Sequence, residues 1–222
     1  MCSYISRVNM TKEVEDIQEW DSEDFELFSM KSAYHRLANH ASRQHDEVFT
    51  CLWKAKALPN VLTTTWRVLL DKIPSRMCLR RREVLVTTTL CGMCGVKDES
   101  SKHLFLGCKH ALSVWSLCFI WIDILFVQHN VLKCHFENFH LVQVSNKQNL
   151  VWKGLWTSIV WSIWEQGNNV IFKQGIVDVE EIFHKAQLKS WLWLWLKHKV
   201  PSYNFSFVDW VLNPLPCIMS FW

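Results

Sequence analysis

The chain has 222 residues, half of them apolar, and a formal net charge of +3. This composition is ample for a packed core and excludes an intrinsically disordered protein, and the fourteen tryptophans against six glycines and five prolines favour helices over many short strands. The longest apolar stretch, residues 114–127, contains Asp123 and is shorter than the roughly 20 apolar residues that span a bilayer, so we expect no membrane association.

The first half of the chain is predicted to contain short helices separated by polar connections. Residues 1–24 show no sustained periodicity and are expected to form a loose lead-in. Apolar residues recur at helical spacing over residues 31–41 and 61–70. Ser75 can cap a further short helix, whereas the β-branched residues 84–90 favour a small strand or an extended arm.

The second half is predicted to contain longer helices. Residues 111–117 continue as a helix, and residues 128–147 are polar and interrupted, which predicts a loop or a second boundary. Apolar periodicity then predicts a helix over residues 150–166 that ends near Gly167. A capping box at its start predicts a last helix over residues 178–198.

These elements predict a mainly α-helical fold with at most short strands. The predicted division is a lead-in of residues 1–24, a helical domain of residues 25–127, a linker of residues 128–148 and a tryptophan-rich helical region of residues 149–222. The nine cysteines are an odd number, and no apolar segment follows the first ten residues. We therefore expect a reducing intracellular compartment, cytoplasmic or nuclear, and not secretion.

The segment CGMCGVKDESSKHLFLGC carries four soft metal donors: Cys91, Cys94, His103 and Cys108. A Cys-x2-Cys pair on a tight turn can place two thiolates at two corners of a tetrahedron. His103 and Cys108, with four residues between them, can supply the other two. Four protein ligands leave no open position, so the spacing predicts a structural Zn²⁺ site in a small CCHC knuckle and argues against a zinc hydrolase.

Two other interpretations of these cysteines stay open. Cys91 and Cys94 look superficially like the redox turn of a thioredoxin, but such a turn opens a helix, and this one leads into the polar residues 95–99. Alternatively, the thiols are free and buried. His110 is a rival fourth ligand to Cys108, which we prefer because a thiolate is the stronger zinc donor.

Charge is distributed unevenly along the chain. Residues 11–26 contain eight acidic residues and one lysine, whereas residues 54–82 contain eight basic residues and one aspartate. The basic segment suits neutralisation of nucleic-acid phosphates, although a solvated helix face has the same pattern. The candidate phosphate-binding residues are Lys72, Arg76, Arg80, Arg81 and Arg82. Phe105 and Trp115 are candidates either for stacking on unpaired bases or for the core.

A run of short motifs occurs in order over about residues 20–116. These are FSMKSAY at 28–34, LWK at 52–54 with Pro59, WR at 66–67, Ile73-Pro74, Leu79, Arg82, the four metal donors with Glu99-Ser100 and Leu104-Phe105 between them, and Trp115. In this order and with these gaps they resemble the zinc-binding domain at the C-terminal end of plant LINE-type (non-LTR) retrotransposon reverse transcriptases. The tail resembles the downstream segment of those reading frames, with WSIW at 161–164, Asn168-Asn169, Ile171-Phe172 and the Ser190-Trp191 helix. It departs at Gly167, where the family more often has arginine.

The resemblance implies a module that accompanies a polymerase and helps to hold element RNA or target DNA during target-primed reverse transcription. The implied partners are RNA or single-stranded DNA and a reverse transcriptase acting in trans, with no small-molecule substrate. The sequence contains no Asp-Asp pair for two catalytic Mg²⁺ ions and no endonuclease or ribonuclease H carboxylate set, so we expect no enzyme activity.

Two alternatives to nucleic-acid binding stay open. In one, the chain is a structural or protein-interaction remnant of the element, with zinc and tryptophans building a fold that retains no ligand. The other is a thiol enzyme. That alternative needs a lowered pKa at Cys91 and a catalytic partner that the sequence does not provide.

Overall fold

The computed structural model describes residues 47–125, 127, 129–142, 144–198 and 205–220. Its helices are α2 (Glu47–Lys54), α3 (Pro59–Leu69), α4 (Arg76–Arg81), the π-helix η2 (His103–Gly107), α5 (Lys109–Trp121), α6 (Leu132–Asn138), α7 (Asn146–Lys173), α8 (Val179–His198), α9 (Phe207–Leu212) and α10 (Pro214–Met219). The predicted lead-in and the helix predicted over residues 31–41 lie outside the described residues.

The described part of the chain is mainly helical, as predicted. Its only β pairing is one isolated antiparallel bridge between Leu90 and Asp98. Residues 84–89 therefore form an irregular arm and not the small strand that their β-branched composition also allowed. Within the described residues, no helix is both long and apolar enough to cross a membrane.

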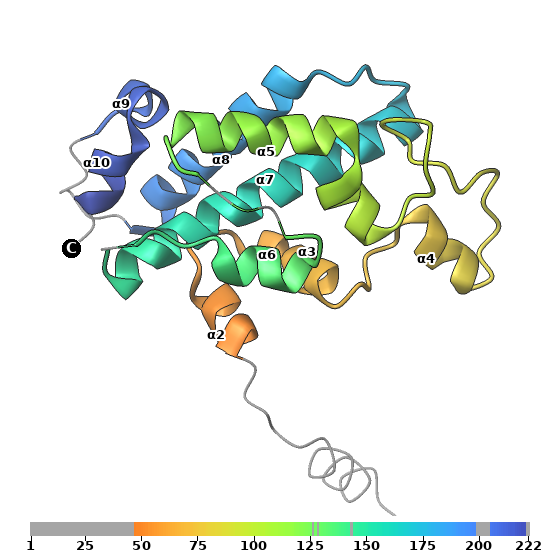
Figure 1. Cartoon of the computed structure of the whole chain (residues 1–222), viewed down its shortest axis with the longest axis horizontal. Coiled ribbons are helices and arrows are strands. Elements are labelled where there is room, and N and C mark those ends of the chain that lie inside the picture. Colours follow the sequence, from red (N-terminus) through yellow and green to blue (C-terminus); the bar gives the residue numbers. More distant parts are fainter. Residues whose placement is uncertain (1–46, 126, 128, 143, 199–204, 221–222) are drawn as a thin grey trace, which may run out of the picture. The chain divides into compact units, whose positions relative to one another are not determined.

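Helix α7 is the centre of this unit. Its first turn is fixed by a capping box, in which the Ser145 hydroxyl accepts the Gln148 N–H and the Gln148 side chain accepts the Ser145 N–H. Every residue from 151 to 160 is buried, because other elements surround the helix on several sides. Contacts run from α7 to α3, α5, α8 and η2, and Figure 1 shows α5 and α8 lying alongside it.

Aromatic rings from three helices build the centre of the core. Trp115 of α5 lies 6.0 Å from Trp156 of α7 and 4.6 Å from His135 of α6, measured between ring centroids. Phe139, directly after α6, stacks on Trp152 at 4.6 Å with the rings nearly parallel. Such pairs add to the free energy gained by burying the rings, so this cluster ties α5, α6 and α7 together.

Helix α6 corrects the loop predicted over residues 128–147. Leu132, His135 and Phe136 form a buried face at helical spacing, but the histidine interrupts that face in the sequence pattern. Its Nδ1 accepts a hydrogen bond from the Trp156 indole at 2.8 Å, which gives this ring nitrogen a partner inside the core. The buried Lys153 ammonium donates to the Phe136 and Glu137 carbonyls and so caps the C-terminal end of α6.

The other predicted helices differ from the structure mainly at their ends. Ser75 caps α4 as predicted, and the Asp178 carboxylate accepts the Glu181 N–H at the start of α8. Helix α7 runs past Gly167 to Lys173, so the predicted end was wrong. Gly167 lies buried inside the helix, next to Leu104 of η2.

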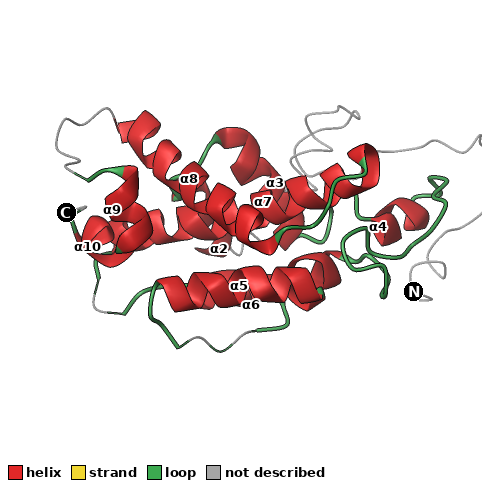
Figure 2. Cartoon of the chain, turned by 90° about the horizontal axis from the view of Figure 1, so that it is seen from above, coloured by secondary structure: helices red, strands yellow, loops and turns green. Residues whose placement is uncertain are grey.

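The last two helices, α9 and α10, were not predicted. A local signal for α9 was present, since Ser206 and Asp209 form a capping box. Both helices lie at the end of the unit opposite α4 (Figures 1 and 2). The described residues from Glu47 onward cluster as one compact unit. The division into a domain of residues 25–127 and a region of residues 149–222 stays a prediction.

Candidate metal centre

The first two candidate ligands lie on a closed turn. The Cys91 N–H donates to the Lys97 carbonyl at 2.7 Å, and the Gly95 N–H donates back to the Cys91 carbonyl at 2.8 Å. Gly95 has φ of +67°, a left-handed conformation that costs glycine little and other residues more. These bonds turn the chain so that Cys91 and Cys94 face the same point. We refer to residues 91–108 as the knuckle.

The other two candidate ligands are joined by the π-helix η2. The Ser100 hydroxyl accepts the His103 N–H at 3.1 Å and starts the turn. The Cys108 N–H then donates to the His103 carbonyl at 2.6 Å, a bond between residues five apart. In an α-helix, residues five apart point about 140° away from each other, at 3.6 residues per turn. The wider π turn brings His103 and Cys108 to one side.

The four donor atoms lie close enough together to bind one metal ion. The Sγ atoms of Cys91, Cys94 and Cys108 and a ring nitrogen of His103 all lie within 4.8 Å of one another. The Cys94 Sγ lies 3.3 Å from the His103 Nε2. A tetrahedral zinc ion with ordinary bond lengths separates sulfur from nitrogen by about 3.6 Å and sulfur from sulfur by about 3.8 Å. The donor set therefore fits one tetrahedral ion.

Hydrogen bonds to the Cys108 sulfur favour its thiolate form. A bond from Cys91 is the main cause that lowers the pKa of Cys108, and the N–H groups of His110 and Ala111, in the first turn of α5, lower it further. The same thiol pair raises the pKa of Cys91, as does burial. Two such sulfurs compete for one proton, whereas a divalent cation stabilises both thiolates.

His103 is suited to the same role. Burial is the main cause that lowers its pKa, and the nearby Lys97 lowers it further. Both effects favour the neutral imidazole, which is the form that binds a metal. His110, the rival fourth ligand, lies outside the cluster of four donors, and its backbone contacts the Cys108 sulfur instead.

Glu99 holds the knuckle to α4, a role that sequence reasoning missed. Its side chain is 2% exposed, and its two carboxylate oxygens accept the Gly92 and Arg76 N–H groups, each at 3.1 Å. The Glu99 carbonyl also accepts the Met77 N–H at 3.1 Å. A buried carboxylate needs such partners, so the charge is stabilised while it fixes the Cys-x2-Cys turn. A carboxylate in a polar loop gave no signal of this burial.

The knuckle also packs on the C-terminal half of α7. A Cβ atom added to Gly92 would lie 2.7 Å from the Ile171 Cγ1, closer than real contacts of this kind. One added to Gly167 would lie 3.7 Å from the Leu104 Cδ1. Two points of the knuckle thus lie directly against the helix that forms the centre of the unit.

The predicted phosphate-binding residues divide into two groups. Lys72, Arg80, Arg81 and Arg82 are exposed around the C-terminal end of α4. Arg81 pairs with Asp71 at 3.4 Å, and Arg82 donates to the Lys72 carbonyl at 3.4 Å. Arg76 differs, because its guanidinium donates to the Leu90 carbonyl at 2.9 Å and braces the approach to the knuckle.

The stacking alternative for Phe105 and Trp115 is wrong. Both side chains are fully buried, and the Trp115 indole donates to the Phe105 carbonyl at 2.9 Å. Both rings belong to the core, because their apolar surface gains more from packing than from solvent exposure.

Comparison with protein families gives one match. A family described as zinc-binding in reverse transcriptase matches residues 28–115, a range that contains all four metal donors and the basic segment. No curated protein and no solved structure matches the chain. The matched region is thus similar to the zinc-binding domain of reverse transcriptases, which supports that prediction. The second half of α5 and all of α6 to α10 lie beyond the match.

Proposed function

We propose that this chain is a zinc-stabilised module that binds RNA or single-stranded DNA, derived from a plant LINE-type (non-LTR) reverse transcriptase and without polymerase activity of its own. The observation that carries the proposal is the cluster of Cys91, Cys94, His103 and Cys108 inside a region similar to a reverse-transcriptase zinc-binding domain. All four corners of the tetrahedron come from the protein, so zinc here stabilises the fold and has no position for substrate.

The proposed nucleic-acid contact lies at the end of α4. A groove of about 490 Å³ runs beside it, lined by Arg80, Glu83 and residues 84–89. Residues 87–89 are three threonines, and hydroxyl and guanidinium groups are common donors to phosphate oxygens. Arg81 and Arg82 extend the positive charge beyond the groove. These donors and positive charges suit the phosphates of a single strand. The chain would bind this strand inside the cell, together with a reverse transcriptase acting in trans.

A structural remnant without nucleic-acid binding is the second candidate. It is favoured by the use of basic groups within the fold, since Arg81 pairs with Asp71 and Arg76 braces the knuckle. Glu83 also places a negative charge in the groove. Exposed ion pairs of this kind are weak, however, and leave Arg81 able to exchange its partner for a phosphate.

Metal analysis of purified protein tests the zinc site. The parent should hold one zinc per chain, and Cys94→Ser should lose it together with part of the folding free energy. Cys134→Ser is the matched control, because Cys134 is a half-buried thiol outside the cluster, and it should keep the metal. Full zinc retention by Cys94→Ser would reject the assignment.

Salt dependence of oligonucleotide binding tests the basic surface. Replacing Arg80, Arg81 and Arg82 together by alanine should flatten the plot of log affinity against log salt by about two units, at roughly 0.7 per single-strand contact. The triple lysine variant keeps the charge and should keep the slope. A folded alanine variant with the parent slope, or a parent that binds no strand at low salt, would favour the remnant.

A further inference from the structure

A second groove, beyond the region that the family matches, runs along the C-terminal half of α7. It has a volume of about 440 Å³, and Lys185 of α8 lines its edge. Three aromatic side chains line it: Trp161, Trp164 and Phe172. The two tryptophans are half-buried, and Phe172 is 78% exposed. An exposed phenylalanine beside two accessible indoles is an unusual surface for a helix whose other faces are packed.

The groove residues form one stripe on the helix. Trp164, Asn168 and Phe172 follow each other at intervals of four, so an amide lies between two rings on the same face. Gly167 and Ile171, which contact the knuckle, lie on the adjoining face. The groove and the knuckle are therefore built on the same two turns of one helix.

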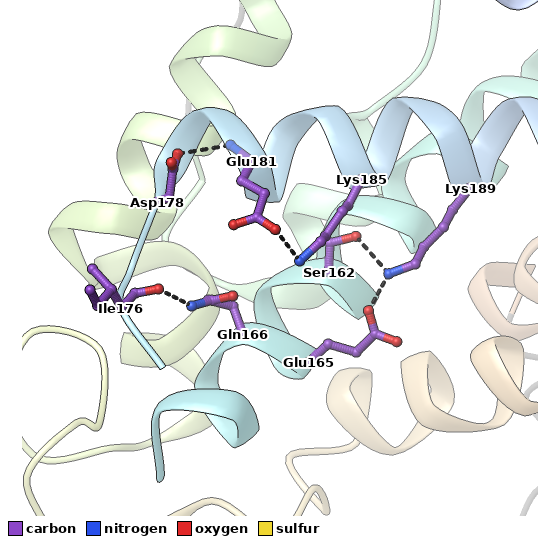
Figure 3. A network of polar contacts seen from close by, with 8 residues as sticks. All are labelled: Ser162, Glu165, Gln166, Ile176, Asp178, Glu181, Lys185 and Lys189. Atoms are coloured by element: carbon purple, nitrogen blue, oxygen red, sulfur yellow. Dashed lines mark hydrogen bonds and ion pairs between the residues drawn. The ribbon is translucent and has the colours of Figure 1, made fainter. Parts of the chain in front are cut away.

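Two lysines of α8 beside the groove are paired with glutamates. Lys189 of α8 pairs with Glu165 of α7, and Lys185 pairs with Glu181 at 2.6 Å (Figure 3). The Trp161 indole donates to Glu165 at 2.7 Å, which fixes that ring at the rim. The Lys189–Glu165 pair joins α8 to α7, whereas the Lys185–Glu181 pair lies within α8, and Lys173 adds one positive charge to the lining. The groove offers a ligand the flat faces of aromatic rings and the Asn168 side-chain amide, which can both donate and accept hydrogen bonds.

We propose that this groove holds unpaired nucleobases of single-stranded RNA or DNA. Bases are neutral, planar rings with hydrogen-bonding edges, which matches stacking on Trp164 and Phe172 with the Asn168 amide on the base edge. Lys173, also in the lining, lies next to Phe172 and suits the adjoining phosphate. An apolar peptide or a lipid would cover the Asn168 amide without offering it a polar partner.

The inference rests on the proposed function, because it assigns a second contact to the same strand. The arginines at the end of α4 would bind backbone phosphates whatever the base sequence, whereas the groove would bind the bases. The two contacts therefore affect different measured properties of binding. Phosphate contacts set the salt slope of binding, and stacking changes affinity with little effect on that slope.

Phe172→Ala tests the groove, using the full chain loaded with zinc. Because Phe172 is mostly exposed, its removal should leave the fold intact, and affinity for a single strand should fall about 5-fold to 100-fold at an unchanged salt slope. Phe172→Tyr keeps a ring and should bind as the parent does. Leu125→Ala removes a fully exposed apolar side chain elsewhere and should have no effect.

A strand with abasic positions provides the decisive comparison. The parent should bind it more weakly than the intact strand, and this difference should be smaller for Phe172→Ala, which keeps Trp164 but has lost one of the two stacking rings. RNA and DNA strands of one sequence show whether the sugar matters. If the parent binds with an arginine-dependent slope but Phe172→Ala matches it on intact strands, the groove proposal is overturned alone. If the parent binds no strand, both proposals fail.

Discussion

Two glycines of α7 provide a matched test of how closely this helix is packed. Gly154 and Gly167 are both buried in the helix interior, so replacing either by alanine gains about 1 kcal/mol of helix propensity. A Cβ atom on Gly167 would meet only the Leu104 Cδ1, at an ordinary 3.7 Å. A Cβ on Gly154 would lie 2.6 Å from the Lys56 carbonyl oxygen and 3.2 Å from its carbon.

The close contact at Gly154 involves backbone, which cannot rotate away as a side chain can. The same loop is attached to α7 by the Lys56 N–H, which donates to the Leu150 carbonyl at 3.2 Å. Overpacking of this kind costs about 1–3 kcal/mol. We expect Gly167→Ala to be about 1 kcal/mol more stable than the parent. Because the propensity gain offsets part of the overpacking cost, Gly154→Ala should be about 0–2 kcal/mol less stable than the parent.

Urea unfolding of the zinc-loaded proteins, followed by helical circular dichroism, measures both variants. The propensity gain is common to them, so the difference between their free energies of unfolding, about 1–3 kcal/mol, reports the close approach alone. Equal slopes with urea would show that the folded states stay alike. A Gly154→Ala variant as stable as Gly167→Ala would refute the argument that the loop backbone touches this helix.

Two further predictions concern pH and metal. Burial, with Lys153 and His129 nearby, lowers the pKa of His135 to about 3, so its contribution to stability is complete above pH 6.5 and falls by about 2 kcal/mol on acidification to pH 5. Urea unfolding of His135→Gln should show a flatter pH profile than the parent, and superimposable profiles would contradict this. Removal of zinc by a chelator should lower the Tm of the whole described unit, because Gly92 of the knuckle packs on Ile171 of α7. If amide hydrogen exchange after chelation rose only within residues 91–108, the knuckle would be shown to unfold independently.

Elements with local signals could be predicted from the sequence. Helices α3, α4, α7 and α8 were predicted because their signals are local. Apolar periodicity and the capping residues Ser75 and Asp178 each involve residues only a few positions apart. Helix α6 could not be predicted in this way, since its buried face includes His135. This ring is buried with a hydrogen bond from the Trp156 indole, which the local sequence does not show. Burial of a polar ring depends on a partner 21 residues away.

The candidate site shows the same division. Spacing alone indicated Cys91, Cys94, His103 and Cys108, and the structure brings them together, while their binding of zinc remains a proposal. The role of Glu99 was missed because its partners are the backbone N–H groups of Gly92, in the Cys-x2-Cys turn, and of Arg76, at the start of α4. The aromatic stripe on α7 could not be told from core by its spacing, since periodicity places residues on a face but does not say whether that face is covered.

The π turn between His103 and Cys108 makes the length of this segment matter more than its composition. Removing one residue would convert the spacing to that of an α-turn and rotate everything after it by about 100°. Helix α5 cannot follow such a rotation, because its Trp115 is buried in the core and Cys108 is the N-cap residue of this helix. The loop at residues 95–98 has no helix phase to preserve. Insertions should therefore be accepted before His103 and rejected after it, so the two halves of the knuckle are under different constraints on variation.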